Sequence, residues 1–112
     1  ISLFRCNILE KDIEEFDIIV SNPPYIAENE MQDMHKNVLD YEPHLALFVD
    51  DSDPLLFYKR IMQLAGKQKA TCYFETSEFY RDLLDEWLNS QSLTFEWKRD
   101  FQDKDRVLKV WW

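Results

Sequence analysis

Glycine is almost absent from this sequence, which has one glycine among 112 residues. Loops that cradle phosphate groups or nucleotide cofactors depend on closely spaced glycines, because glycine lets the backbone approach a ligand most closely. No Gly-x-Gly pattern occurs anywhere in the chain. The sequence therefore excludes a glycine-rich phosphate or cofactor loop within these residues.

Cysteine is also scarce, and long apolar runs are missing. Cys6 and Cys72 are too few and too far apart for a metal cluster or a disulfide framework, and both lie in apolar, strand-like runs, so we expect buried free thiols. His35 and His44 have no Cys or carboxylate at a spacing that makes a convincing metal site, so we expect surface or structural histidines and no metal. No apolar run is long enough to cross a membrane and no signal-peptide pattern occurs, which favours a cytoplasmic protein without a membrane partner.

Basic side chains are outnumbered by acidic ones, 13 against 22, and the net charge is −9. Affinity for a phosphate backbone comes mainly from Lys and Arg, so this balance disfavours direct binding of nucleic acid. Aromatic residues, in contrast, are plentiful at 15% of the chain. They can fill the interior of one small domain.

The most informative stretch covers residues 16–26. Residues 18–20 form a β-branched apolar run, which predicts a strand buried on both faces, as in parallel sheets. Asn22 follows this run, and the prolines at positions 23 and 24 cannot continue a hydrogen-bonded ladder because they lack an N–H. We therefore expect a stiff, extended turn that holds the Asn22 side chain at the carboxyl end of the strand, where open α/β sheets bind ligands.

The atoms of this turn suit a planar –NH₂ group. The side-chain oxygen of Asn22 and the carbonyl of Pro23 both accept hydrogen bonds, one for each hydrogen of the group. Tyr25 adds a flat face on which an amide or a base can stack. The turn therefore predicts a site that presents an amino nitrogen to an electrophile.

Hydrophobic patterns outside the turn predict the remaining elements. The expected elements are a strand at residues 1–8, a near-helical segment at 28–41, a helix that starts at Ser52 or Asp53 and stops near Gly66, a strand at 70–74, a helix that starts at Ser77, and a strand pair at 93–97 and 107–112. Glu42 either ties the long connection to the proline turn or pins a loop, and we favour the loop. Glu75 either lines the site or meets solvent, and we favour solvent.

Three motifs carry a resemblance to a known family. Asn-Pro-Pro-Tyr at positions 22–25, after an apolar strand, resembles the amino-methylating branch of the S-adenosylmethionine-dependent methyltransferases. Residues 41–47 are similar to the Glu-Pro-x-x-Ala-Leu segment of the HemK/PrmC family, the release-factor glutamine N5-methyltransferases, and Asp-Arg-Val at 105–107 also matches that family. The similarity covers nearly the whole chain, but only the second half of such an enzyme's catalytic domain.

The resemblance implies an α/β fold, namely the C-terminal part (strands 3 to 7) of a seven-stranded Rossmann-like methyltransferase, with a mixed sheet and a C-terminal hairpin. In that family the sheet order is 3-2-1-4-5-7-6. Residues 1–112 are then expected to form a partial catalytic domain that lacks the glycine-rich cofactor loop. A missing N-terminal half, or another chain, would cover the sheet, and we expect the isolated chain to bind S-adenosylmethionine poorly and to be inactive.

The resemblance also implies a reaction and its residues. A methyl group passes from S-adenosylmethionine to the side-chain amide of a glutamine in a peptide chain release factor, which is the implied partner. Asn22 and Pro23 are the implied catalytic residues. Asn22, Pro23, Pro24 and Tyr25 are the implied substrate-binding residues.

The implied cofactor-binding residues are Asn7, Ile8 and Asn22. Asn7 stands where the family usually has an Asp near the adenine, and Ile8 stands where a side chain covers that ring; alternatively, Asn7 merely ends a strand. Two rival functions stay open. One is an N6-adenine methyltransferase acting on nucleic acid, with Tyr25 stacking on a flipped base, and the other is a non-catalytic fragment that kept the fold.

Overall fold

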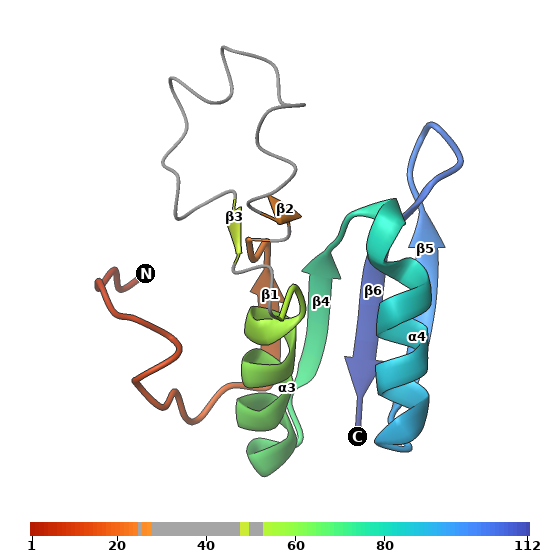
Figure 1. Cartoon of the computed structure of the whole chain (residues 1–112). Coiled ribbons are helices and arrows are strands. Elements are labelled where there is room, and N and C mark those ends of the chain that lie inside the picture. Colours follow the sequence, from red (N-terminus) through yellow and green to blue (C-terminus); the bar gives the residue numbers. More distant parts are fainter. Residues whose placement is uncertain (25, 28–47, 50–52) are drawn as a thin grey trace, which may run out of the picture.

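A four-stranded mixed sheet forms the centre of the computed structural model, which describes residues 1–24, 26–27, 48–49 and 53–112 (Figure 1). The strands follow the order β1-β4-β6-β5, and their bounds are Ile18–Ser21 for β1, Thr71–Glu75 for β4, Thr94–Arg99 for β5 and Asp105–Trp111 for β6. β1 is parallel to β4, whereas β6 is antiparallel to β4 and β5. This order corresponds to strands 4-5-7-6 of the expected fold, so the α/β fold class with its C-terminal hairpin is confirmed.

Two helices cover one face of the sheet (Figure 1): α3 (Leu56–Gln68) and α4 (Arg81–Ser90), the latter preceded by the short 3₁₀ helix η2 (Glu78–Tyr80). Alternate residues of β4 and β6 point under them, and the four side chains Cys72, Phe74, Leu108 and Val110 are at most 1% exposed. Tyr58 of α3 packs against Phe74, with the two ring centroids 5.4 Å apart. Removing these apolar side chains from water holds the helices on the sheet.

The opposite face of the sheet is open, and this overturns one expectation. Ile18 and Val20 of β1 are 61% and 78% exposed, so the predicted burial of residues 18–20 on both faces is wrong. Only Ile19, between them, packs against the core under the helices. The reason is that, in the part of the chain that the structure describes, no helix covers this face and β1 is the last strand on its side of the sheet.

The expected strand at residues 1–8 is not formed, because this segment has no regular secondary structure before a turn at residues 8–10. In the expected sheet order its neighbour is strand 2, and none of the described strands takes that place, so a strand here would leave its backbone groups unpaired. Cys6 is consequently exposed, against expectation, whereas Cys72 is buried as predicted. Ile8 does pack against the core.

The predicted helix starts need correction: α3 begins at Leu56, three residues after Asp53, and Ser77 caps η2, with α4 beginning only at Arg81. The side chain of Asp53 accepts a hydrogen bond from the Leu55 N–H (3.1 Å) just before α3, and Ser77 Oγ accepts one from the Phe79 N–H (3.3 Å) before α4. The predicted stop near Gly66 is wrong, because α3 continues to Gln68. A Cβ at Gly66 would lie 3.2 Å from the indole Nε1 of Trp112, so this glycine provides room for an aromatic ring instead of ending the helix.

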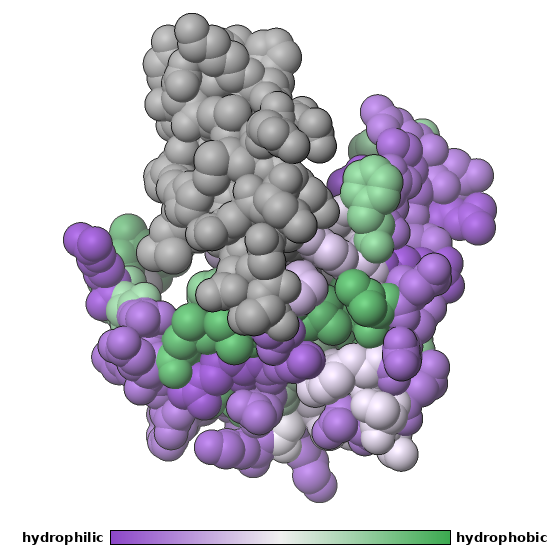
Figure 2. All heavy atoms as spheres, in the orientation of Figure 1, coloured by the Kyte–Doolittle hydropathy of each residue, from purple (hydrophilic) through white to green (hydrophobic). Residues whose placement is uncertain are grey.

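Hydrophobic surface gathers at the ends of α3 and α4 where the helices begin (Figure 2). The exposed apolar side chains there include Leu56, Phe79 and Leu83, which are 37%, 80% and 45% exposed. Because both helices begin at the carboxyl ends of β1 and β4 (Figure 1), this surface adjoins the edge of the sheet that carries Asn22. None of the helices in the described residues is both long and apolar enough to span a bilayer.

The two thiols should differ sharply in reactivity. Burial raises the pKa of the Cys72 thiol to about 12, so at pH 8 it stays protonated and enclosed, whereas Cys6 is exposed. We expect a colorimetric thiol reagent to titrate one cysteine in the native chain and two in denaturant. A Cys6→Ser variant should show no fast reaction, and rapid labelling of both thiols in the native protein would contradict the packing of β4 under α3.

Candidate functional site

The proline turn leaves β1 at the carboxyl edge of the sheet. Ser21, the last residue of β1, pairs with Phe74 of β4, so Asn22 and Glu75 follow at the same edge. Asn22 is exposed, while Pro23 behind it is buried and anchors the turn. After the turn, the two-residue strand β2 (Ile26–Ala27) pairs in parallel with β3 (Phe48–Val49), which comes later in the chain. The exposed amide of Asn22 is therefore held by backbone on both sides of it.

A cavity of about 230 Å³ opens beside Asn22, and its lining includes Val20, Asn22, Tyr73, Glu75 and Val107. Glu75 is the one charged residue of this lining, and its side chain is exposed. It thus meets solvent, as we favoured, and lines the cavity of Asn22 as well. Its backbone carbonyl accepts a hydrogen bond of 3.2 Å from the Tyr58 hydroxyl, which ties this edge of the sheet to α3.

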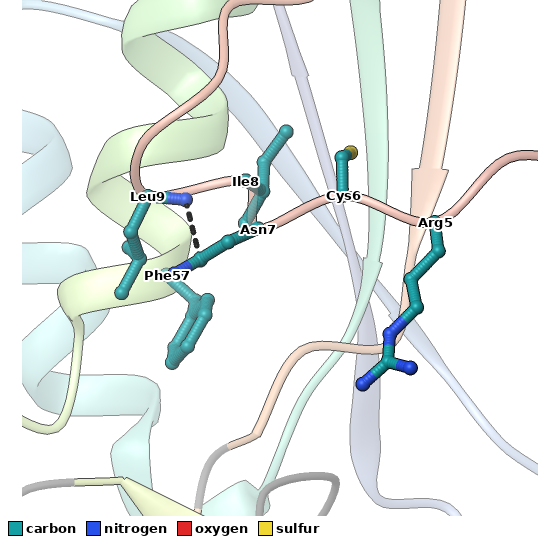
Figure 3. Close-up of a pocket in the computed structure, with 6 residues that line it drawn as sticks. All are labelled: Arg5, Cys6, Asn7, Ile8, Leu9 and Phe57. Carbon is teal, nitrogen blue, oxygen red and sulfur yellow. Dashed lines mark hydrogen bonds between the residues drawn. The ribbon is translucent and has the colours of Figure 1, made fainter.

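Asn7 and Ile8 line a second, larger cavity of about 580 Å³, shown in Figure 3. Asn7 forms the start of a turn: its side-chain oxygen accepts a hydrogen bond from the Leu9 N–H (3.1 Å), and its backbone carbonyl accepts from the N–H groups of Glu10 (3.0 Å) and Lys11 (2.9 Å). The alternative that Asn7 ends a strand is wrong, because no strand precedes it and Asn7 instead begins this turn. Ile8 is half-buried against the core.

The structure does not bring all the predicted site residues into one cavity. The cavity beside Asn22 and the cavity beside Asn7 share no lining residue. Phe57 of α3 lines the second cavity, and Arg60 of the same helix bonds to the backbone of Ile8. Neither residue could be found from the sequence, because both lie about 50 positions away from Ile8 in the chain and only their spacing of three on a helix indicates a shared face.

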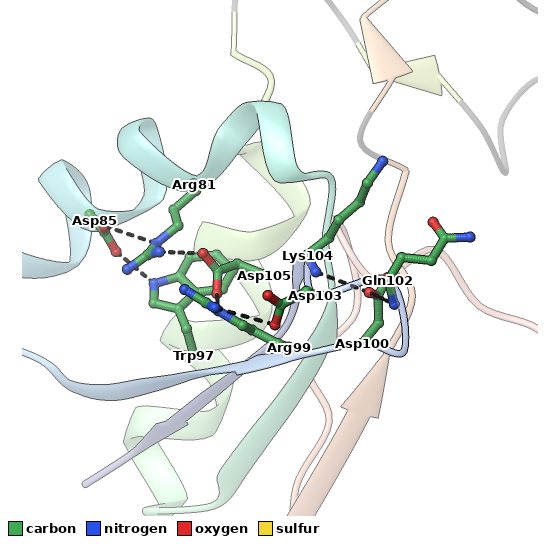
Figure 4. Close-up of polar contacts among 9 residues, drawn as sticks. All are labelled: Arg81, Asp85, Trp97, Arg99, Asp100, Gln102, Asp103, Lys104 and Asp105. Carbon is green, nitrogen blue, oxygen red and sulfur yellow. Dashed lines mark hydrogen bonds and ion pairs between the residues drawn. The ribbon is translucent and has the colours of Figure 1, made fainter.

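The third motif of the resemblance, at residues 105–107, lies in a polar network (Figure 4). Asp105 pairs with Arg81 at the start of α4 and with Arg99 of β5 (3.6 Å). Asp85 accepts a hydrogen bond of 2.7 Å from the Trp97 indole N–H and pairs with Arg81 (3.5 Å). These contacts fasten the hairpin to α4, so Asp105 contributes to the scaffold. Val107, the last residue of the motif, lines the cavity beside Asn22.

The hairpin loop is closed by one carboxylate. Asp100 Oδ1 accepts hydrogen bonds from the N–H groups of Lys104 (3.1 Å) and Gln102 (2.8 Å). The bond from the Lys104 N–H is the main cause that lowers the pKa of Asp100. The positive φ of 61° at Asp103 completes the tight turn in a loop that has no glycine.

Some predictions fall outside the described residues. These concern Tyr25, Glu42, His35, His44, Ser52 and the segment 28–41. Within the described ranges, no three His, Cys, Asp or Glu side chains come together as a metal site would require.

Comparison with known proteins gives a consistent assignment. A family model described as the Eco57I restriction-modification methylase matches residues 3–105. The release factor glutamine methyltransferases of Flavobacterium psychrophilum and Bacteroides thetaiotaomicron are each 44% identical to this chain, over 98% and 83% of its length. The one from Clostridium acetobutylicum is 38% identical over 91% of the chain.

The chain spans 41%, 35% and 38% of the length of these three relatives. The match therefore concerns one part of a longer kind of protein, and it runs through the sheet, both helices and both cavities described above. The chain belongs to the methylase family that this model describes, and over most of its length it is similar to one part of the release factor glutamine methyltransferases.

Proposed function

We propose that this chain is part of a protein-(glutamine-N5) methyltransferase that acts on peptide chain release factors in the cytoplasm, with S-adenosylmethionine as the methyl donor. The observation that carries the proposal is the exposed Asn22 held at the carboxyl end of β1 by a buried proline. The relatives' names support the substrate and the reaction.

In the proposed reaction, Asn22 and Pro23 position the –NH₂ group of the substrate glutamine. An amide nitrogen is a poor nucleophile because its lone pair is delocalised into the carbonyl. The Asn22 oxygen and the Pro23 carbonyl accept one hydrogen bond each from the glutamine –NH₂, and they stabilise the positive charge that develops as the N–C bond forms and the S–C bond breaks. A preorganised group of this kind contributes about 3 kcal/mol, and the proton leaves the nitrogen afterwards to solvent.

Pro24 and Tyr25 complete the substrate site in this proposal, with the Tyr25 ring stacking on the flat carboxamide. The donor occupies the side of the site formed by Asn7, Ile8 and Asn22. The described residues fit the donor in part: the cavity at Asn7 and Ile8 has room for a nucleoside and an apolar wall. The chain's single glycine lies in α3, so no glycine-rich loop of this chain holds the rest of the donor.

We further propose that residues 1–112 are a partial catalytic domain. The open face of the sheet, where Ile18 and Val20 are exposed, supports this proposal, because apolar side chains of a parallel strand are normally covered. A further segment of the same protein, or another chain, would cover that face and supply the missing loop.

The two rival functions have less support. The matching family model is described as a restriction-modification methylase, which agrees with action on nucleic acid, but the net charge of −9 opposes binding of a phosphate backbone. A non-catalytic fragment has no need for an exposed amide between a strand and a buried proline.

Replacing Asn22 tests the proposed site. In the full-length protein, Asn22→Ala should lower kcat by about 100-fold or more, because one of two acceptors for the –NH₂ is removed. The KM for S-adenosylmethionine should change much less. Asn89→Ala, which removes an exposed asparagine at the far end of α4, is the matched control and should behave as wild type. Retained turnover in Asn22→Ala would remove this residue from its proposed role.

Offering two substrates separates the main proposal from its rival. We expect the full-length protein, given radiolabelled donor, to methylate a glutamine-containing release factor and to leave adenine-containing duplex DNA unlabelled. Mass spectrometry of the digested release factor should locate the methyl group on a glutamine side chain. Labelled adenine without labelled release factor would favour the nucleic-acid methyltransferase instead.

Calorimetry of the 112-residue chain tests the partial-domain proposal. We expect no saturable heat of S-adenosylmethionine binding at micromolar concentrations, because no glycine-rich loop is present. A Kd in the micromolar range for this chain alone would show that it carries a complete donor site.

A further inference from the structure

Arg60 of α3 makes three hydrogen bonds to one short segment of the chain. Its Nε donates to the carbonyl of Ile8 (2.9 Å), and a terminal nitrogen donates to the carbonyl of Lys11 (3.3 Å) and to the carboxylate of Asp12 (2.8 Å). The arginine side chain is only 19% exposed. Its hydrogen bond is the main cause that lowers the pKa of Asp12. A single guanidinium thus holds residues 8–12 against α3.

The segment that Arg60 holds is the turn that begins at Asn7. The Asn7 carbonyl and side-chain oxygen close this turn through the N–H groups of Leu9, Glu10 and Lys11. Residues 1–7 before the turn lack regular secondary structure. The position of Asn7 and Ile8 in the fold therefore depends on α3, through the hydrogen bonds of Arg60 and the packing of Ile8 against the core.

Phe57 lies one helical turn before Arg60 on α3, and residues three apart share a helix face. It is half-buried and lines the cavity of about 580 Å³ together with Asn7 and Ile8 (Figure 3). This volume is within the usual range for small-molecule sites, roughly 300–1,000 Å³. α3 thus supplies one wall of the cavity through Phe57 and holds the residues of the other wall through Arg60.

We propose that Phe57 forms a second wall of the donor's nucleoside site, opposite Asn7 and Ile8. Arg60 is the positioning residue that holds Asn7 and Ile8 in place. This inference rests on the proposed function, which assigned the donor to Asn7 and Ile8. A flat, partly exposed phenyl ring suits contact with a purine base. Arg60 acts through Ile8 and the turn, and it touches no reacting atom.

The test measures nucleoside binding apart from turnover. In the full-length protein, Phe57→Ala and Arg60→Ala should each raise the Kd for S-adenosylhomocysteine, the donor without its methyl group, by about tenfold in calorimetry. The KM for S-adenosylmethionine should rise in parallel, whereas kcat at saturating donor should stay within about threefold of wild type.

Conservative variants keep the test informative if an alanine variant fails to fold. Phe57→Leu keeps an apolar wall without a flat ring, and Arg60→Lys keeps the charge but not the forked geometry that reaches three acceptors; both should weaken binding less than alanine. Arg99→Ala is the matched control, because it removes an arginine whose ion pairs to Asp103 and Asp105 are in the hairpin. It should leave the Kd unchanged.

Each outcome decides the proposal. Unchanged affinity for S-adenosylhomocysteine in folded Phe57 and Arg60 variants would overturn it, as would an equal loss of affinity in Arg99→Ala. Failure of the proposed function is a different result: the wild-type protein would bind S-adenosylhomocysteine and respond to the α3 variants, yet would not methylate a release factor.

Discussion

The packing of Tyr58 on Phe74 is the contact on which the rest of the structure depends. It joins α3 to β4 in the core, and the Tyr58 hydroxyl reaches the backbone carbonyl of Glu75 at the carboxyl edge. Because β1 pairs in register with β4, the same contact sets where Asn22 leaves the sheet. One buried aromatic pair therefore positions both the helix that lines one cavity and the strand that opens into the other.

Local chemistry accounts for the elements that could be predicted from the sequence. The β-branched run before Asn22 forms β1, and the prolines end it at the expected place. The burial of that strand could not be predicted, because exposure of Ile18 and Val20 depends on what covers the sheet and not on the strand itself. The role of Gly66 as a helix stop was wrongly predicted for a similar reason: its neighbour Trp112 is distant in the chain, and no local pattern reveals that contact.

The candidate site likewise combines residues that a local pattern indicates with residues that only contacts distant in the chain bring together. Asn22 and Pro23 are proposed from a strand followed by a proline turn, which is a local pattern. Phe57 and Arg60 have no such local signal, since their contacts to the Asn7 turn join segments about 50 residues apart. The proposed site has two parts, an exposed amide on the sheet edge and a separate cavity against α3.

We propose that the proline turn binds a carboxamide through two oxygen acceptors. A crystal structure of the full-length protein with S-adenosylhomocysteine and a glutamine-containing release-factor peptide would show this contact. The glutamine side-chain nitrogen should lie about 2.7–3.2 Å from both the Asn22 side-chain oxygen and the Pro23 carbonyl oxygen. A bound glutamine whose nitrogen contacts neither oxygen would contradict it.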